Sequence, residues 1–459
     1  MTTDQPNVVI IVIDTLRNGT IDFNRLRLGD PEIFNDFTVY GNCVSPASWT
    51  LSSHASIFTG KYASEHTIHE DKEKRISTIM PDAVTELKFK TIFQLLKKRG
   101  YMNYGISRNP ILRPGTIFER GFDVLQYFEF PFLVNNDYSN LYEKILNEFE
   151  LPVYAFGFSA KKTIAVGMIK ERRMRELMDF YLSRRKANKL FKIQGFPLEK
   201  GATHILEILK HSSLLKPFSL FLNIMEMHEP YPTAFSLYDS YKQLISQERM
   251  KTGKVQEIRR EYIAQGKRVR NFLRAFLSNL KAMGEWDNTL VIITSDHGQS
   301  LWEHGFGGHG SFLYNELVRV PLLVKYPNNH SGGIANMLCS TVDIFGLIDN
   351  FSSGDLFEIQ PSDVVFSESF GLINQFKQIL FSKSNDERER LEVALRSIDF
   401  RNISAFKGNV KITLNAEDGK ITEYLENSKA VEINRARIVE TGILDDIEIF
   451  DGKIVLPFR

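Results

Sequence analysis

Two aspartates in this sequence follow short apolar runs. Asp14 comes after Val8–Ile13, and Asp296 follows Leu290–Thr294 and precedes His297. Such runs predict strands that are buried on both faces, as in the middle of a parallel sheet. Ligands bind at the carboxyl edge of an open α/β sheet, so we expect the two aspartates to meet there. Each aspartate taken alone could equally be a helix cap or a turn residue.

The segment from Ser45 to His66 reads SPASWTLSSHASIFTGKYASEH. It resembles the signature of the sulfatase family, a branch of the alkaline phosphatase superfamily. In that signature a nucleophile is followed by any residue, then Pro, Ser, Arg, Ala, Ser, two apolar residues, Thr and Gly. Matching Gly60 to the final glycine places the nucleophile at Thr50, with His54 in place of the arginine and Ser52 in place of the proline.

The resemblance also includes the opening strand with Asp14, the TSDHG segment around Asp296 and the RVPLLV run after it, and so covers most of residues 7–327. It implies one divalent metal ion held by Asp14, Thr50, Asp296 and His297. Carboxylate oxygens and one imidazole suit calcium, magnesium, manganese or zinc, so the identity of the ion stays open. A cation beside the Thr50 hydroxyl would lower its pKa enough for attack on phosphorus or sulfur.

Two residues depart from the family pattern. Sulfatases convert a cysteine or serine to formylglycine, and Thr50 cannot yield that aldehyde because its Cβ carries a methyl group. We therefore expect no formylglycine and favour phosphoryl transfer, as in relatives that use threonine directly, among them nucleotide phosphodiesterases and phosphoethanolamine or phosphoglycerol transferases. The second departure is Thr15, where many sulfatases have another aspartate.

Three further polar residues are candidates for contact with the substrate. His228, in NIMEMHEPY, resembles the family's His-x-Pro-Tyr segment, which implies substrate binding or proton donation. His309 stands twelve residues after His297, where many relatives have lysine, and could act as hydrogen-bond donor, general acid or extra metal ligand. Asn109, in SRNPIL, is either a substrate-facing residue or a turn residue before Pro110. His54 is assigned to substrate binding, or to support of the nucleophile from behind.

Strand and helix patterns alternate along the first part of the chain. They predict an α/β fold: an alkaline-phosphatase-like three-layer α/β/α sandwich with a largely parallel central sheet. Further strands are expected at 102–106, 218–224 and 320–324, and helices at 91–99 and 268–283. We expect a catalytic domain over residues 1–350 with a helical insertion at about 138–200, and a small C-terminal α+β subdomain with an antiparallel sheet over residues 351–459.

The composition indicates a globular chain with no overall field for nucleic acid. Lysine and arginine total 57 against 56 acidic residues in 459, and 43% of residues are hydrophobic. The basic residues of the insertion form either a solvated helix face or a rim that attracts an anionic ester substrate. Cys43 and Cys339 are expected to be buried thiols. The start of the chain lacks a signal pattern, and no apolar window is long enough to span a bilayer, so we expect a cytoplasmic protein without a transmembrane segment.

These observations predict a metal-dependent hydrolase or transferase of phosphate or sulfate esters that acts through a covalent Thr50 intermediate. The alternatives are a true sulfuric ester hydrolase that uses unmodified Thr50, and a binding protein of the same fold without turnover. A two-zinc phosphodiesterase is disfavoured because Met225–Tyr231 lacks the Asp-x-x-x-His pair of such enzymes. The sequence leaves the physiological substrate, the acceptor and the oligomeric state open.

Overall fold

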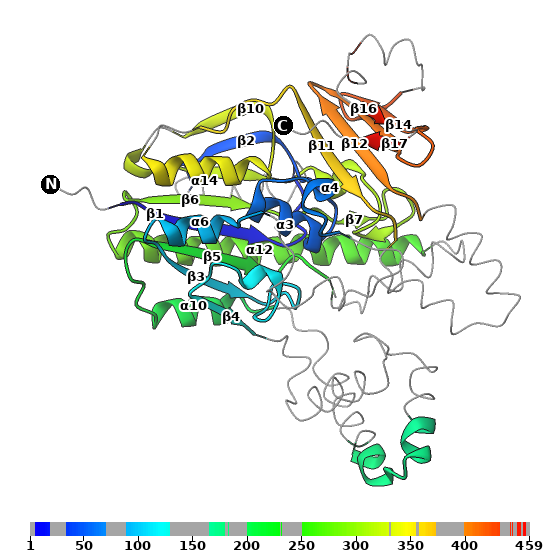
Figure 1. Cartoon of the computed structure of the whole chain (residues 1–459), viewed down its shortest axis with the longest axis horizontal. Helices are drawn as coiled ribbons and strands as arrows, with labels where there is room; N and C mark the ends of the chain where they lie inside the picture. Colours follow the sequence, from blue (N-terminus) through cyan, green and yellow to red (C-terminus); the bar gives the residue numbers. More distant parts are fainter. Residues whose placement is uncertain are drawn as a thin grey trace, which may run out of the picture.

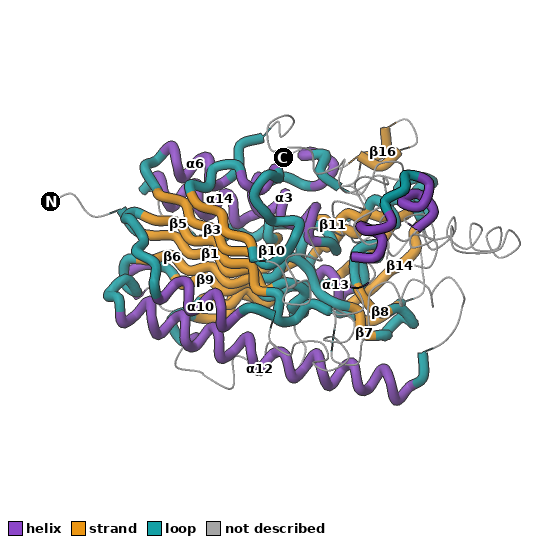
Figure 2. The backbone as a smooth tube through the Cα atoms, turned by 90° about the horizontal axis from the view of Figure 1, so that it is seen from below, coloured by secondary structure: helices purple, strands orange, loops and turns teal. Residues whose placement is uncertain are grey.

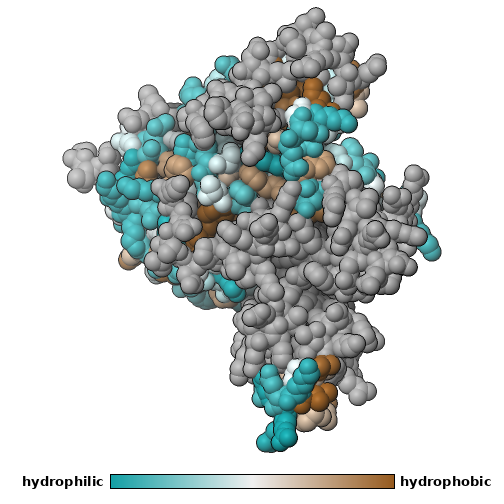
Figure 3. Space-filling view, turned by 45° about the vertical axis from the view of Figure 1, so that its right-hand side comes forward, coloured by the Kyte–Doolittle hydropathy of each residue, from teal (hydrophilic) through white to brown (hydrophobic). Residues whose placement is uncertain are grey.

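The computed structural model describes residues 5–18, 34–69, 89–128, 165–179, 182, 200–229, 231, 250–329, 332–354, 358–372, 399–431, 441, 443, 448–450 and 453–455. Most of the predicted insertion lies outside these ranges. Within it, residues 165–170 and 174–179 are helical. Figure 3 shows hydrophilic and apolar side chains on different sides of this piece. Ile169, Met174 and Met178 are exposed. Both interpretations of the basic residues here stay predictions.

The core of the molecule is an eight-stranded sheet with the strand order β10-β2-β9-β6-β1-β5-β3-β4. Neighbouring strands are parallel except at β9, which is antiparallel to both β2 and β6. The strands are β1 (Asn7–Ile13), β2 (Thr38–Val44), β3 (Met102–Ser107), β4 (Val124–Tyr127), β5 (Phe218–Ile224), β6 (Thr289–Thr294), β9 (Leu322–Lys325) and β10 (Gly333–Ser340).

Helices cover both faces of this sheet, which gives the predicted three layers (Figures 1 and 2). Successive strand residues point to opposite faces, so Val8, Ile10 and Val12 of β1 enter one hydrophobic cluster while the intervening residues enter the other. The first cluster includes side chains of α3 (Thr50–Thr59), α6 (Ile92–Lys98) and α14 (Asp343–Ser353). The second includes side chains of α10 (Ala202–Lys210) and α12 (Thr252–Ala282). A strand buried on both faces is expected to be almost continuously apolar, and in β1 the run Val8–Ile13 is apolar, as the sequence predicted.

A five-stranded antiparallel sheet lies beside the α/β core in Figure 1. Its strands are β11 (Val364–Ser369), β12 (Asn402–Lys407), β13 (Val410–Asn415), β14 (Ile421–Glu426) and β15 (Lys429–Ala430). Val365 and Phe406 of this sheet pack with Val44 and Leu317 of the core. The expected antiparallel sheet is therefore present, and the division into domains near residue 350 stays a prediction.

Shorter elements complete the described chain. They are α4 (Ala63–His66), the 3-10 turns η1 (Ile117–Glu119) and η3 (Pro327–Asn329), α13 (Asn315–Val318), and the strand pairs β7 (Ser300–Leu301) with β8 (Gly307–Gly308) and β16 (Glu448–Phe450) with β17 (Lys453–Val455). Among the helices that the structure describes, none combines the length and apolar character needed to cross a bilayer.

Some strands escaped the sequence analysis because they lack a clear apolar pattern. In β10 the first five residues are exposed or half-buried, and β2 contains the exposed Gly41. The two strands pair in parallel, with Cys43 opposite Cys339. Both cysteines are free and buried, as predicted.

Candidate active site

The carboxyl ends of β1 and β6 bring Asp14 and Asp296 together. The strands are parallel neighbours with Val12 opposite Thr294, so both chains leave the sheet at the same edge. The turn after Asp14 requires Thr15 to adopt a left-handed backbone (φ 61°), and the Thr15 N–H then donates to Asp296 Oδ1 at 3.3 Å. At Thr15, where many sulfatases have an aspartate, this chain therefore contributes a backbone N–H that binds the Asp296 carboxylate.

Thr50 and His297 complete a cluster of four side chains. Thr50 is the first residue of α3, and His297 follows Asp296 directly. His297 Nε2 lies 3.2 Å from Thr50 Oγ1, 3.4 Å from Asp296 Oδ2 and 3.9 Å from Asp14 Oδ1. The ring is oriented by its Nδ1–H, which donates to the Gly298 carbonyl at 2.9 Å. We call these four residues the nucleophile cluster.

The carboxylates of the nucleophile cluster are buried in a way that favours a cation. Both aspartates are 0% exposed, and no hydrogen-bond partner within the described chain reaches Asp14 Oδ1 or Asp296 Oδ2. Burial, together with the Asp296 charge, raises the pKa of Asp14 to about 6, and burial raises the pKa of Asp296 to about 7. Burial lowers the pKa of His297, which keeps its ring neutral. Two unpaired carboxylate oxygens, one neutral imidazole and a hydroxyl form a donor set that fits a divalent metal ion.

Two further predicted residues, Asn109 and His54, contact members of this cluster. Asn109 Oδ1 accepts from the Ile111 N–H at 2.9 Å, which turns its Nδ2 toward Asp14 Oδ2 at 2.8 Å. His54 lies one helical turn after Thr50, and its Nδ1 is 3.1 Å from the Thr50 carbonyl and 3.5 Å from Asp296 Oδ2. Burial lowers the pKa of His54 to about 3, so the ring is neutral. Direct contact of either residue with substrate stays a prediction.

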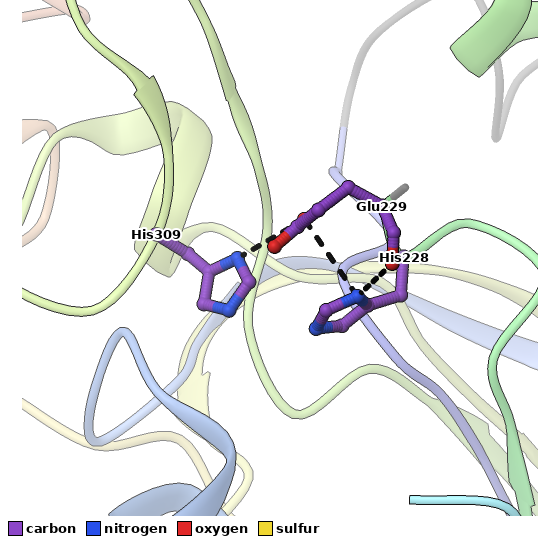
Figure 4. Close-up of side chains that lie close together, drawn as sticks. All are labelled: His228, Glu229 and His309. Carbon is purple, nitrogen blue, oxygen red and sulfur yellow. Dashed lines mark hydrogen bonds and ion pairs between the residues drawn. The ribbon is translucent and has the colours of Figure 1, made fainter. Parts of the chain in front are cut away.

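The other two predicted residues, His228 and His309, meet in a second cluster with Glu229 (Figure 4). His228 and Glu229 follow β5, and His309 follows β8. The ring centroids of His228 and His309 are 5.0 Å apart, and those of His297 and His309 are 4.5 Å apart. The second cluster therefore adjoins the nucleophile cluster across the His309 ring. We call it the histidine cluster.

The two histidines of this cluster differ electrostatically. Burial alone would lower the pKa of His228, but the Glu229 and Asp14 carboxylates raise it above its usual value. Burial and the neighbouring histidines hold the pKa of His309 well below its usual value. His309 is therefore neutral at physiological pH.

Three residues near the histidine cluster were missed by the sequence analysis. Glu229 is 6% exposed, and its carboxylate accepts from Gln299 Nε2 at 2.8 Å. Lys200 is buried, and its ammonium donates to the carbonyls of Glu226 and His228. Burial lowers the pKa of Lys200 to about 8. Glu229 and Gln299 could have been found because they lie next to motif residues, Glu229 after His228 and Gln299 after the TSDHG segment. Lys200 lies in no motif.

Comparison with family models identifies the chain. The model of the sulfatase family matches residues 6–348. The chain belongs to the sulfatase family. Its fold agrees with that assignment: it resembles a phosphonate monoester hydrolase from Silicibacter pomeroyi with a TM-score of 0.60 at 15% identity, over 99% of both chains. It also resembles a 2-O GAG sulfatase with a TM-score of 0.60 at 13% identity, over 96% of this chain and 92% of the other.

Sequence similarity to individual members of the sulfatase family is local. The chain is 32% identical over 112 residues to an N-acetylglucosamine-6-O-sulfatase of Bacteroides thetaiotaomicron, which is 24% of this chain and 19% of that protein. It is 31% identical over 106 residues to the multifunctional alkaline phosphatase superfamily protein PehA of Trinickia caryophylli, which is 22% of this chain and 20% of the relative. Each match thus spans about a fifth of the relative's length.

Proposed function

We propose that this member of the sulfatase family hydrolyses or transfers phosphate or sulfate esters, with phosphoryl transfer favoured, and that Thr50 is the nucleophile. The observation that carries the proposal is the convergence of Thr50 Oγ1, His297 Nε2 and the unpartnered oxygens of Asp14 and Asp296 in one buried cluster. The family assignment supports an ester-bond hydrolase. The methyl group on the Thr50 Cβ supports a hydroxyl nucleophile in place of formylglycine.

Asp14, Asp296, His297 and Thr50 would hold one divalent metal ion, whether calcium, magnesium, manganese or zinc. When bound, the ion would lower the pKa of the adjacent hydroxyl and so favour loss of the Thr50 proton to solvent. Asn109 holds the Asp14 carboxylate from behind at 2.8 Å. His54 Nδ1 contacts the Thr50 carbonyl at 3.1 Å, which supports the first turn of α3, and lies 3.5 Å from Asp296 Oδ2. Both residues thereby help to fix the positions of the Asp14 carboxylate and of Thr50.

The reaction then proceeds in two displacements. Thr50 Oγ1 forms a bond to phosphorus or sulfur as the bond to the leaving oxygen breaks. The negative charge that develops on the leaving oxygen is stabilised from the histidine cluster, by His228 and His309. Water or an acceptor alcohol next attacks the esterified Thr50, gives up its proton, and restores the free hydroxyl.

The histidine cluster favours turnover over mere binding. The cluster pairs His228, whose pKa is raised by the Glu229 and Asp14 carboxylates, with His309, which burial keeps neutral beside the buried Glu229 carboxylate. Such a pair suits charge that changes during a reaction. The expected cytoplasmic location and the identity of the alcohol half of the substrate stay predictions.

Acid trapping tests the role of Thr50. Purified protein loaded with a divalent metal is mixed with an aryl phosphate, phosphodiester, phosphonate or sulfate ester, quenched in acid, digested and mapped by mass spectrometry. We expect a label on Thr50, and none in the Thr50→Ala variant, which should still bind metal and substrate because Asp14, Asp296 and His297 remain. A label on Ser48, Ser52 or Ser53, or full turnover by Thr50→Ala, would refute the assignment.

A further inference from the structure

The turn that follows Asp14 has a strained backbone. Thr15 is left-handed, with φ 61°, and this conformation is unfavourable for a β-branched residue because its Cβ crowds the neighbouring backbone. In this conformation the Thr15 N–H reaches Asp296 Oδ1 at 3.3 Å. The sheet places the ends of β1 and β6 side by side, but the direction of this N–H depends on the turn. A backbone conformation of this kind persists only where surrounding groups hold it in place.

One hydroxyl group contacts both ends of the turn. The Tyr262 hydroxyl donates to the Thr15 carbonyl at 2.8 Å and accepts from the Arg17 N–H at 3.1 Å. The Leu16 N–H between them donates to Ser295 Oγ at 2.9 Å. A phenol hydroxyl can donate one hydrogen bond and accept another. Tyr262 therefore uses both capacities on the backbone of the turn.

The position of this hydroxyl is fixed by the packing of α12, which lies along one face of the sheet (Figure 2). The Tyr262 side chain is 0% exposed and belongs to the second hydrophobic cluster, together with Ile258 and Val269 of the same helix. Its ring also packs against the Tyr231 ring, with 6.2 Å between the ring centroids. A ring enclosed in a close-packed core has little freedom to move, so the hydroxyl is a rigid support for the turn.

The same helix also contacts the segment that binds the Arg17 side chain. Arg17 Nη1 pairs with Glu303 Oε1 at 2.8 Å. Arg259, three residues before Tyr262, donates to the Leu301 carbonyl at 2.8 Å and lies 3.9 Å from Glu303 Oε1. Residues three apart lie on the same side of a helix. One side of α12 thus supports the backbone of the turn and, less directly, the Arg17 side chain.

Removal of the Tyr262 hydroxyl would deprive two buried backbone groups of a partner. Thr15 is 0% exposed and Arg17 is 7% exposed. An unpaired buried carbonyl or N–H is costly, so we expect the turn to relax from its left-handed form. The Asp296 carboxylate would then lose the Thr15 N–H and keep only the His297 N–H, at 2.9 Å, of the two backbone groups that orient Oδ1.

We infer that Tyr262 is a positioning residue of the nucleophile cluster: its hydroxyl holds the turn after Asp14 in the left-handed form, so that the Thr15 N–H fixes the Asp296 carboxylate for the metal ion. This inference rests on the proposed function and deepens it, because it assigns part of the geometry of the metal site to an outer helix. Groups that orient metal ligands commonly set the affinity for the ion. Tyr262 acts in this way through the backbone of the turn.

Metal titration of the full chain tests the inference. Protein stripped with a chelator is titrated with manganese, or separately zinc, in competition with a fluorescent chelator. We expect Tyr262→Phe to bind the ion about 10- to 100-fold more weakly than the wild type, the usual range when a group that orients a ligand is lost. Tyr231→Phe is the matched control, because it removes a hydroxyl from an equally buried ring that donates to the Met227 carbonyl at 2.9 Å. It should keep the wild-type metal affinity.

Thr15→Gly shows whether the hydroxyl acts through the turn. Glycine adopts a left-handed backbone readily and keeps the N–H that binds Asp296. Tyr262→Phe should therefore reduce metal affinity much less in the Thr15→Gly background than in the wild type, a departure from additivity that reports coupling. If Tyr262→Phe alone fails to fold, the double variant should fold and bind metal as Thr15→Gly does. Failure of both to fold would assign the hydroxyl to the core and overturn the inference.

The remaining outcomes separate this inference from the proposed function. Wild-type affinity in Tyr262→Phe, an equal loss in Tyr231→Phe, or the same loss with and without Thr15→Gly would overturn the role of Tyr262. The proposed function would stand in each case, provided that the wild type binds an ion that Asp296→Asn loses. A wild type that binds no divalent ion would overturn the proposed function and the inference together.

Discussion

The two clusters of the active site are built on different parts of the fold. In the nucleophile cluster, Asp14 and Asp296 stand at the ends of paired central strands and Thr50 begins a fully buried helix. In the histidine cluster, His228 and Glu229 lie in the chain after β5, and His309 lies after the two-residue strand β8. The first is therefore positioned by the sheet, and the second by hydrogen bonds between side chains in loops.

This difference predicts how each cluster responds to change. Removing a ligand from the nucleophile cluster leaves the strands that carry it intact, so chemistry should be lost without loss of fold. The histidine cluster depends on Gln299, which bridges Glu229 and His309. Its geometry should therefore be sensitive to residues that touch neither metal nor substrate.

The largest effect is expected from the carboxylates of the nucleophile cluster. Asp296→Asn or Asp14→Asn should lower metal occupancy of this site at least tenfold, roughly the minimum seen when outer partners of a metal site are removed. The fold should survive, because each change removes a charge that burial disfavours. Elemental analysis and circular dichroism of the two variants are the measurements, and Asp418→Asn, in an exposed turn, is the control. Undiminished metal in both variants would show that the ligands lie elsewhere.

A smaller effect is expected from the histidine cluster. His228→Ala and His309→Ala should each reduce turnover by about 10² to 10⁴, the usual range for groups positioned against a leaving oxygen. The melting temperature should change little, because both histidines lie in loops and outside the hydrophobic clusters. Steady-state kinetics and thermal melts on the same preparations compare the two effects. If stability falls in parallel with activity, the two histidines are structural residues.

The smallest effect is a pH dependence of stability in the metal-free protein. The folded-state pKa values of about 6 for Asp14 and about 7 for Asp296 lie above the ordinary value of 3.8. The folded state therefore holds these protons more tightly than the unfolded chain, so the pair's contribution to the free energy of unfolding falls as pH rises from about 4 to about 7. Protein treated with chelator should melt at a lower temperature at pH 8 than at pH 5.

The control for this prediction is the double variant Asp14→Asn with Asp296→Asn, in which the slope of melting temperature against pH should be shallower. Metal added to the wild type at pH 8 should restore the lost stability, because it binds the charged carboxylates of the folded state. Equal slopes in the wild type and the double variant would contradict the assigned pKa shifts.

Part of the active site could be predicted from short stretches of sequence. The run before Asp14 and the ten-residue spacing from Thr50 to Gly60 are local patterns, and the structure brings Thr50, Asp14, Asp296 and His297 together. Asn109 was found by its place after a strand, but its contact with Asp14 could not be foreseen. Lys200 could not be found at all, because its contacts with Glu226 and His228 join positions that no motif connects.

The sequence by itself determined which segments are buried strands, because a strand covered on both faces is a nearly continuous apolar run. The strands β1, β5 and β6 are buried at every position and are mostly apolar. The sequence also determined which side chains follow these strands and could therefore form a site at the edge of the sheet. The tertiary structure alone decided the order of the strands, the antiparallel insertion of β9 between β2 and β6, and the pairing of Glu229 with His309. The physical reason is that the burial of an apolar segment does not depend on which other segment covers it. A site, in contrast, requires particular atoms from distant segments to lie within a few ångströms of one another. Only the complete packing of sheet, helices and loops fixes those distances.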